Sequence, residues 1–319
     1  MSTGHRPAPP AGRARTGPDA AALTEVAPGV FAYLQPDGSW FINNTGLILG
    51  EDQVLSIDTC ATEARTRAYL AAIRTVTPQP VTTLVNTHHH GDHTNGNRLL
   101  GAQVIVAQTR CRDLLARHDG PPPPGLFTPV DWGDITRALP TVCFDRRLDL
   151  HDGTRRIELL HFGTPAHTTN DVVAWLPAER ILFAGDLAFN GGTPFALSGS
   201  ISGWLDVLAA LGDLAPDIVI PGHGAPGGPE LLRDTADYLA FVQDAALPAH
   251  RAGLPPLQAA AATDLGRYAE LSDAERIVGN LHRAYAELRG QPPGCPLDDS
   301  ECFADMITFN DGQPLRCLA

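Results

Sequence analysis

The run THHHGDHTNG at positions 87–96 places four metal-binding side chains within six positions, directly after an apolar, β-like segment. Imidazole and carboxylate groups suit zinc and its neighbours among the divalent ions. His88 and His90 are two positions apart, so in an extended turn both can point toward one ion, which leaves Asp92 and His93 for a second. This run therefore predicts half of a two-metal site.

Three further candidate ligands follow, each at the end of a later apolar segment. His167 lies in GTPAHT, Asp186 in FAGD and His223 in PGHG. Together with the first run they make seven candidate ligands. A single histidine after a strand is usually a surface or core residue, so the prediction depends on these blocks occurring together in one chain.

The order H-x-H-x-D-H, then His, then Gly-Asp, then Gly-His-Gly resembles the signature of the metallo-β-lactamase superfamily over roughly residues 22 to 228. The resemblance implies an α/β fold, the αββα sandwich, in which two sheets pack face to face with helices outside. It also implies two zinc ions per chain and an assignment of the ligands. By this assignment His88, His90 and His167 hold one ion, Asp92, His93 and His223 hold the other, and Asp186 bridges them.

Two residues close to these blocks are not assigned to a metal. The alternation of side chains should turn His89 away from the ions, toward solvent or toward groups that support the ligands. Asp58, at the end of VLSID, resembles the aspartate that supports a ligand in the superfamily. A strand-end or helix-capping role is the alternative for Asp58.

Two closely spaced divalent ions determine which reactions such a site can perform. Zinc lowers the pKa of bound water from about 15.7 to near 7, and it also polarises carbonyls and stabilises enolates and oxyanions. We expect Asp92 and Asp186 to act in catalysis together with hydroxide generated by the metals. Hydrolysis and metal-assisted aldol chemistry are both open, and the same ligands accept manganese or iron.

The chain divides into three parts. Residues 1–20 are rich in Pro, Ala, Gly and Arg and lack an apolar stretch, which predicts a disordered leader and no secretion signal. Residues 21–228 alternate helical segments with strand-like runs, and the ligands follow those runs. The strand-like runs are 47–49, 54–57, 81–85, 104–106, 157–160, 172–176, 181–183 and 218–220.

Residues 229–319 predict a C-terminal helical extension that packs on the same domain. The sequence SDAE at Ser272–Glu275 matches a capping box ahead of an apolar stripe at helical spacing. Such a stripe serves core packing or a homodimer face, with a lid over the pocket as the functional alternative. Residues 119–140 form an insertion without clear periodicity, which is either a substrate wall or a surface excursion.

Composition excludes several classes of protein. A balance of 23 basic against 36 acidic residues argues against a nucleic-acid surface. No segment approaches the roughly 18 apolar residues that span a bilayer, so we expect no membrane association and a cytoplasmic location. All 23 basic residues are arginines, so any carbonyl condensation must proceed without a lysine Schiff base.

Segments outside the ligand blocks resemble the actinorhodin-type second-ring cyclases of aromatic polyketide biosynthesis. These segments are VDWGDI at 130–135, GTPFALSGS at 192–200, DAER at 273–276, NLHRA at 280–284 and CLA at 317–319. The resemblance implies that a carrier-protein-bound polyketide with its first ring closed undergoes an intramolecular aldol condensation and dehydration. Thioester hydrolysis then releases a bicyclic product.

The same resemblance names the expected partners. The substrate would be carrier-bound, with an acyl carrier protein as a transient partner. Arg146–Arg147 and Arg155–Arg156 are candidate docking residues, with a solvated face as the alternative. Four aromatic residues are candidate pocket walls for a flat substrate, with core packing as the alternative for each. They are Trp132, Phe189, Phe195 and Trp204.

Two other functions remain open. A general zinc hydrolase of the superfamily would act on a thioester, a lactone or a β-lactam, and would cleave simple reporters rapidly. A non-catalytic metal-binding scaffold within a biosynthetic complex is the second alternative. The intact set of seven ligands argues against the scaffold, because a site without function tends to lose its ligands.

Overall fold

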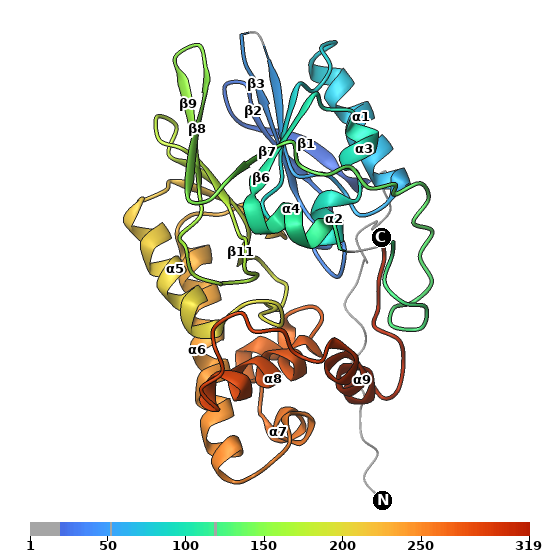
Figure 1. The fold of residues 1–319 in the computed structure, drawn as a ribbon, viewed down its shortest axis with the longest axis vertical. Coiled ribbons are helices and arrows are strands. Elements are labelled where there is room, and N and C mark those ends of the chain that lie inside the picture. The colour runs from blue at the N-terminus through green and yellow to red at the C-terminus, as the bar shows by residue number, and fades with distance from the viewer. Residues whose placement is uncertain (1–19, 52, 118–119) are drawn as a thin grey trace, which may run out of the picture.

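The computed structural model describes residues 20–51, 53–117 and 120–319. Two β-sheets stand against each other, with helices on their outer sides and a group of helices at one end (Figure 1). This is the αββα sandwich with C-terminal helices, so the predicted fold class is confirmed. Of the predicted leader, residues 1–19 lie outside the described residues.

The first sheet has seven strands in the order in which they occur along the chain. Its first four strands pair antiparallel and its last three continue in parallel. The strands are β1 (Ala22–Ala27), β2 (Val30–Leu34), β3 (Thr45–Leu49), β4 (Val54–Ile57), β5 (Thr83–Val85), β6 (Val104–Gln108) and β7 (Val142–Phe144).

The second sheet has five strands in the order β12-β11-β10-β9-β8. Only the β11–β12 pair is parallel, so the carboxyl ends of these two strands meet at one edge of the sheet. The strands are β8 (Arg147–Asp152), β9 (Arg155–Leu160), β10 (Val173–Leu176), β11 (Ile181–Phe189) and β12 (Ile218–His223).

Both sheets are covered on both faces, which explains why their central strands are continuous apolar runs in the sequence. Ile48 and Phe183 point into the core between the sheets, whereas their neighbours Leu47 and Leu182 point into cores under the outer helices. Successive side chains of a strand alternate between faces, so each strand contributes to two cores.

Helices cover the outer face of each sheet. α1 buries Tyr69 and Ile73 against the first sheet, and Thr62 caps this helix by accepting a hydrogen bond from the Arg65 amide. α5 covers the second sheet with Val207 and other apolar residues. These helices are α1 (Glu63–Val76), α2 (Gly91–Thr94), α3 (Asn97–Leu100), α4 (Thr109–Leu115) and α5 (Ile201–Asp213).

The C-terminal helices share one apolar core with the second sheet. Leu239 and Leu281 from these helices are fully buried beside Trp204 of α5 and Leu187 of β11. None of the helices in the described parts of the chain is long and apolar enough to cross a membrane. The remaining helices are α6 (Glu230–Arg251), α7 (Pro256–Ala262), a 3-10 helix (Gly266–Glu270), α8 (Arg276–Leu288) and α9 (Asp299–Phe309).

All eight predicted strand-like runs contribute to strands, but four strands had no prediction. β1 and β7 are edge strands with largely exposed residues, and β8 alternates apolar with charged residues. β2 is short and buried throughout most of its length. Edge strands carry little periodic signal because much of their surface stays in contact with solvent, and a buried run as short as β2 offers few positions in which a period can be recognised.

The predicted capping box at Ser272–Glu275 is wrong. α8 begins at Arg276 with Glu275 as its N-cap, and no side chain caps it. The Ser272 carbonyl instead accepts hydrogen bonds from the amide and the hydroxyl of Thr193, and its Oγ has no hydrogen-bond partner among the described residues. Pairing with a distant segment has replaced the local motif.

Replacing Leu281 with Ala should lower the free energy of unfolding by about 2–5 kcal/mol, because the side chain is fully buried and leaves a cavity. Urea unfolding followed by circular dichroism should show a single transition at a lower midpoint, since helices and sheet share this core. Leu288→Ala, on an exposed position of the same helix, is the control. A separate early transition of the C-terminal helices would contradict the shared core.

Candidate metal centre

The seven candidate ligands meet where strands of both sheets end. His88 and His90 follow β5, and His167 lies between β9 and β10. Asp186 lies within β11, and His223 is the last residue of β12. Asp92 and His93 form part of the short helix α2 (Gly91–Thr94). Parallel strand pairs in both sheets thus direct their carboxyl ends to one place, as α/β proteins generally do at ligand sites.

One group of ligand atoms comprises His88, His90, His167 and Asp186, all within 4.8 Å of one another. Nδ1 of His90 lies 3.1 Å from Nε2 of His88 and 2.9 Å from Nε2 of His167. Oδ2 of Asp186 is 3.4 Å from the same His167 nitrogen. Three imidazole nitrogens and one carboxylate therefore converge.

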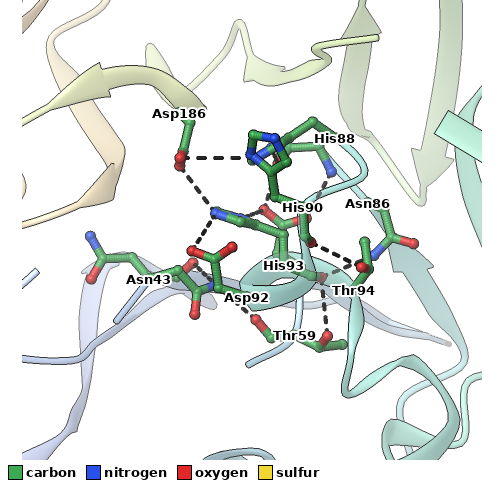
Figure 2. Close-up of polar contacts among 12 residues, drawn as sticks. Asn43, Thr59, Asn86, His88, His90, Asp92, His93, Thr94 and Asp186 are labelled. Atoms are coloured by element: carbon green, nitrogen blue, oxygen red, sulfur yellow. Dashed lines mark hydrogen bonds and ion pairs between the residues drawn. The ribbon is translucent and has the colours of Figure 1, made fainter. Parts of the chain in front are cut away.

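A second group comprises Asp92, His93 and His223, again within 4.8 Å. Oδ2 of Asp92 lies 3.2 Å from Nε2 of His223 and 3.5 Å from Nε2 of His93. Asp186 reaches this group as well, with Oδ1 3.1 Å from His93 Nε2 and Oδ2 3.4 Å from His223 Nε2. Figure 2 shows Asp186 and Asp92 approaching His93 from opposite sides.

These residues fit two divalent cations. His93 Nε2 and Asp186 Oδ1 are buried 3.1 Å apart, yet neither makes an aligned hydrogen bond to a described residue. The ligand atoms of each group lie close enough together to bind one ion. The donor set of imidazole nitrogens and carboxylate oxygens is one that zinc accepts. The structure thus gathers the seven residues into the two groups expected from the sequence, with Asp186 between them.

Asp58 supports His93 directly and His88 through Thr87. Its Oδ2 lies 2.8 Å from His93 Nδ1, and its two oxygens accept hydrogen bonds from the amide and the hydroxyl of Thr87. The Thr87 hydroxyl also lies 3.0 Å from His88 Nδ1. These contacts at Nδ1 fix the orientation of each ring, so that its Nε2 atom points to the candidate metal position. Asp58 therefore supports a ligand and does not cap a helix, and Thr87 is a supporting residue that the sequence analysis missed.

Three of the four candidate pocket aromatics lie in the core. Trp204 is fully buried with its ring 5.4 Å from His167, and Phe189 stacks on His223 at 5.4 Å and 5°. Phe195 is buried, and its carbonyl oxygen lies 2.6 Å from His167 Nδ1. These three residues contact the rings of His167 and His223 on the side of the apolar core. Trp132 is half-buried and packs edge-to-face on Phe41, with the ring centres 5.0 Å apart.

His89 belongs to neither ligand group. Its Nδ1 accepts a hydrogen bond of 3.1 Å from the Asn170 side chain, and its ring lies 4.7 Å from that of His90. This position beside a ligand agrees with the expected orientation away from the ions. Asn170, which is buried, gave no signal in the sequence.

The metal-free centre has an uneven charge pattern. Burial and the neighbouring histidines lower the pKa of His88 and His90 well below the usual value, so both are neutral. Burial also disfavours charge on His93 and His223, but the carboxylates of Asp186 and Asp92 outweigh it. The pKa of His93 rises well above its usual value, and that of His223 rises to about 9.

Comparison with known proteins gives the family. The family model described as the metallo-beta-lactamase superfamily matches residues 38–223, which is more than half of the chain and includes all seven ligands. The chain belongs to the metallo-β-lactamase superfamily.

The relatives of this chain carry names that refer to different substrates. A linear primary-alkylsulfatase from Pseudomonas is 24% identical over 66% of this chain and 48% of its own length. A type 2 metallo-beta-lactamase from Bacteroides fragilis is 26% identical over 68% of this chain and 84% of its own. A hydroxyacylglutathione hydrolase from Rhodospirillum rubrum is 31% identical over 45% and 48%. The chain thus spans about half the length of the first and third relatives.

Solved structures of the superfamily share the fold. A metallo-beta-lactamase from Pontibacter korlensis aligns with a TM-score of 0.58 at 22% identity, covering 69% of this chain and 99% of that one. The DIM-1 metallo-beta-lactamase aligns with a TM-score of 0.55 at 23% identity, covering 69% of this chain and 97% of that one. At these identities the likeness shows the sandwich and not the substrate.

Gly222 is required for the position of Asp186, because a Cβ at this glycine would collide with Asp186 Oδ1. Replacing Gly222 with Ala should therefore lower zinc content from two ions per chain while the fold remains, measured by elemental analysis and circular dichroism. Gly212→Ala, on α5 with open space around its Cβ position, is the control. Full zinc content in Gly222→Ala would show that the centre tolerates a displaced Asp186.

Zinc binding should release about two protons, because His93 and His223 are protonated in the metal-free centre and bind metal only when neutral. The apparent affinity for zinc should therefore rise with pH from neutral pH, and the rise should become less steep above about pH 9, where His223 has lost its proton. Competition with a chromophoric chelator across this range measures the effect. An affinity that does not change with pH, after correction for the chelator, would contradict it.

Proposed function

We propose that this protein is a dinuclear zinc hydrolase that cleaves acyl thioesters. The main support is the position of Asp186, which lies within 3.1–3.4 Å of ligand nitrogens in both groups and thereby joins them into one two-metal centre. The three relatives described above are named for different substrates, and a hydrolytic reaction is what they have in common.

The thioester is the substrate class on which two independent arguments agree. The hydroxyacylglutathione hydrolase acts, by its name, on an acyl group carried by glutathione, and such an acyl group is a thioester. The resemblance to second-ring cyclases also ends in hydrolysis of a carrier-bound thioester. The β-lactam and the sulfate ester have no such second line of support.

Three aspartates of the centre would have separate roles in hydrolysis. When bound, two zinc ions would polarise the acyl carbonyl and make water acidic enough to react near neutral pH. Asp92 stays ionised, because the charges of His93 and His223 outweigh its burial and lower its pKa. Its carboxylate can therefore orient a water molecule and accept its proton. Asp186 contacts both ligand groups and so fixes their relative position, and Asp58 holds the ring of His93 through its Nδ1 atom.

Second-ring cyclisation is the more specific candidate for the same site. Three of the segments that carry the cyclase resemblance contact one another, because 192–200 packs against 273–276 and 280–284, about 80 residues further along the chain. Arg276 donates a hydrogen bond to the Thr193 carbonyl, and the Asn280 amide group bonds Pro194 and Ala196. These residues adjoin Phe189, which stacks on His223. Such a shared location supports a common role in substrate recognition.

An acyl carrier protein remains part of this second candidate, but three of the four arginines expected to dock it form ion pairs, and the fourth, Arg146, donates a hydrogen bond to the Phe162 carbonyl. Arg147 lies 2.8 Å from Asp149, and Arg155 lies 2.7 Å from Glu179. Arg156 forms an ion pair with Glu158. These pairs neutralise much of the positive charge that would attract an acidic carrier, so we do not place the docking surface there.

The zinc-loaded protein should hydrolyse acyl N-acetylcysteamine thioesters, and a chelator should abolish the activity. Asp186→Ala should lower kcat/KM more than about a hundredfold, the loss that changing even a supporting residue of a metal site can cause. Asp217→Ala is the matched control, because it removes an exposed carboxylate at the opposite end of the same strand pair. Liberated thiol and bound zinc would both be measured.

A carrier-bound polyketide with its first ring closed, made in situ, separates the two candidates. Release of an uncyclised acid would support the hydrolase, whereas chelator-sensitive release of a bicyclic aromatic would establish the cyclase. Failure to act on either thioester with two zinc ions bound would refute the proposed function.

A further inference from the structure

Main-chain hydrogen bonds connect residues 272–273, just before α8, to the metal centre. The Ser272 carbonyl accepts hydrogen bonds from the Thr193 amide at 3.1 Å and from its hydroxyl at 2.7 Å. The Ser272 amide donates to the Gly191 carbonyl at 3.0 Å, and the neighbouring Asn190 amide donates to the carbonyl of His223 at 3.0 Å. A short run of main-chain bonds thus connects Ser272 and Asp273 to a metal ligand.

Asp273 and Arg276 form a buried ion pair at this point. Their side chains are 7% and 3% exposed, and Asp273 Oδ2 lies 3.0 Å from Arg276 Nη2. Asp273 has a φ of 58°, an unusual conformation for a residue other than glycine, asparagine or aspartate. The guanidinium group lies 3.9 Å from the ring centre of Trp40 and 5.8 Å from that of Phe189, which stacks on His223.

Two buried polar atoms of this cluster, Ser272 Oγ and Arg276 Nε, have no hydrogen-bond partner among the described residues. Within the same part of the chain, Asp273 Oδ2 has only the Arg276 guanidinium group beside it. Buried polar atoms are nearly always paired, so these atoms leave hydrogen-bonding capacity for a bound group. The atoms offer donors, Nε–H and the hydroxyl, together with a carboxylate acceptor. The opposite charges of Asp273 and Arg276 compensate each other, which favours a neutral group with an O–H over an anion.

Electrostatic interactions place this cluster close to the metal centre. Burial raises the pKa of Asp273 to about 6, against the opposing effects of Arg276 and His223. Burial likewise raises the pKa of Cys317 to about 11, and the carboxylates of Asp92 and Asp273 both add to that shift. The Cys317 thiol donates a hydrogen bond of 3.6 Å to the carbonyl of Trp40, whose ring lies against the Arg276 guanidinium group.

We propose that Ser272, Asp273 and Arg276 form a substrate subsite beside the metal centre that binds a hydroxyl or enol oxygen of the acyl chain. The oxygen accepts hydrogen bonds from Arg276 Nε and the Ser272 hydroxyl and donates a hydrogen bond to Asp273. The subsite deepens the proposed function and rests on it, since it selects oxygenated acyl chains among thioesters. The helices beyond the ligand-bearing strands thereby contribute to substrate choice.

Direct binding tests this subsite without relying on turnover. The probes are amide analogues of the thioesters, in which NH replaces sulfur, each with a hydroxyl at carbon 3, 5 or 7 of the acyl chain or with none. The zinc-loaded wild type should bind at least one hydroxylated probe about tenfold more tightly than the unsubstituted one, measured by calorimetry. Asp273→Asn and Ser272→Ala should bring this ratio close to one.

Asp305→Asn is the matched control. Asp305 of α9 lies 2.9 Å from His282 of α8, the helix that also carries Arg276, and its substitution should leave the ratio unchanged. Ser272→Ala keeps the test valid if Asp273→Asn fails to fold, since Ser272 Oγ makes no hydrogen bond to any residue that the structure describes. Equal binding of all probes by the wild type, or a preference that survives both substitutions, would overturn the subsite.

Hydrolysis of the matching thioesters by the same preparations separates the two proposals. Preferential binding without hydrolysis would refute the thioester hydrolase and leave the subsite standing. Hydrolysis that is equally fast with and without the hydroxyl groups, combined with equal binding, would refute the subsite alone.

Discussion

The buried carboxylate of Asp186 among four imidazole rings is the interaction on which the rest of this structure depends. Burial penalises its charge, but the positive charges of His223 and His93 outweigh that penalty and hold its pKa well below the usual value. An ionised carboxylate in a protein interior is tolerated only when surrounding charges and polar groups compensate it. The ligand clusters must therefore be assembled together, and the fold has to deliver them from both sheets to one point.

The two sheets are joined directly at this point and not only through apolar packing. The Val172 amide, ahead of β10, donates a hydrogen bond of 2.7 Å to the carbonyl of Thr87 in the first sheet's ligand loop. The Asn44 amide, ahead of β3, donates one of 2.6 Å to Gly222, next to His223. Each sheet thus positions ligands supplied by the other, so the relative placement of the layers is fixed by polar contacts at the centre itself.

The ligand blocks and central strands could be predicted from sequence because their signals are local. A short polar motif after an apolar run identifies the loop, and continuous apolar runs identify strands buried on both faces. The edge strand β8 gave no such signal, and the role of Ser272 depends on a partner about 80 residues away. The positions of Phe189 and Trp204 behind the ligands follow from tertiary packing, which no local pattern encodes. The substrate depends on the same long-range contacts, which explains why the sequence left hydrolysis and aldol chemistry open.

The supporting contacts of the histidines have a consequence for how the protein acquires its metal. Asp58, Thr87 and the Phe195 carbonyl lie against the Nδ1 atoms of His93, His88 and His167, so these rings are oriented before any ion arrives. A cavity shaped in advance for imidazole and carboxylate coordination admits any divalent ion of suitable affinity. The identity of the ion in the purified protein should then depend on which divalent ions were available in the cell where the chain folded. Exchange of that ion should not require the chain to refold.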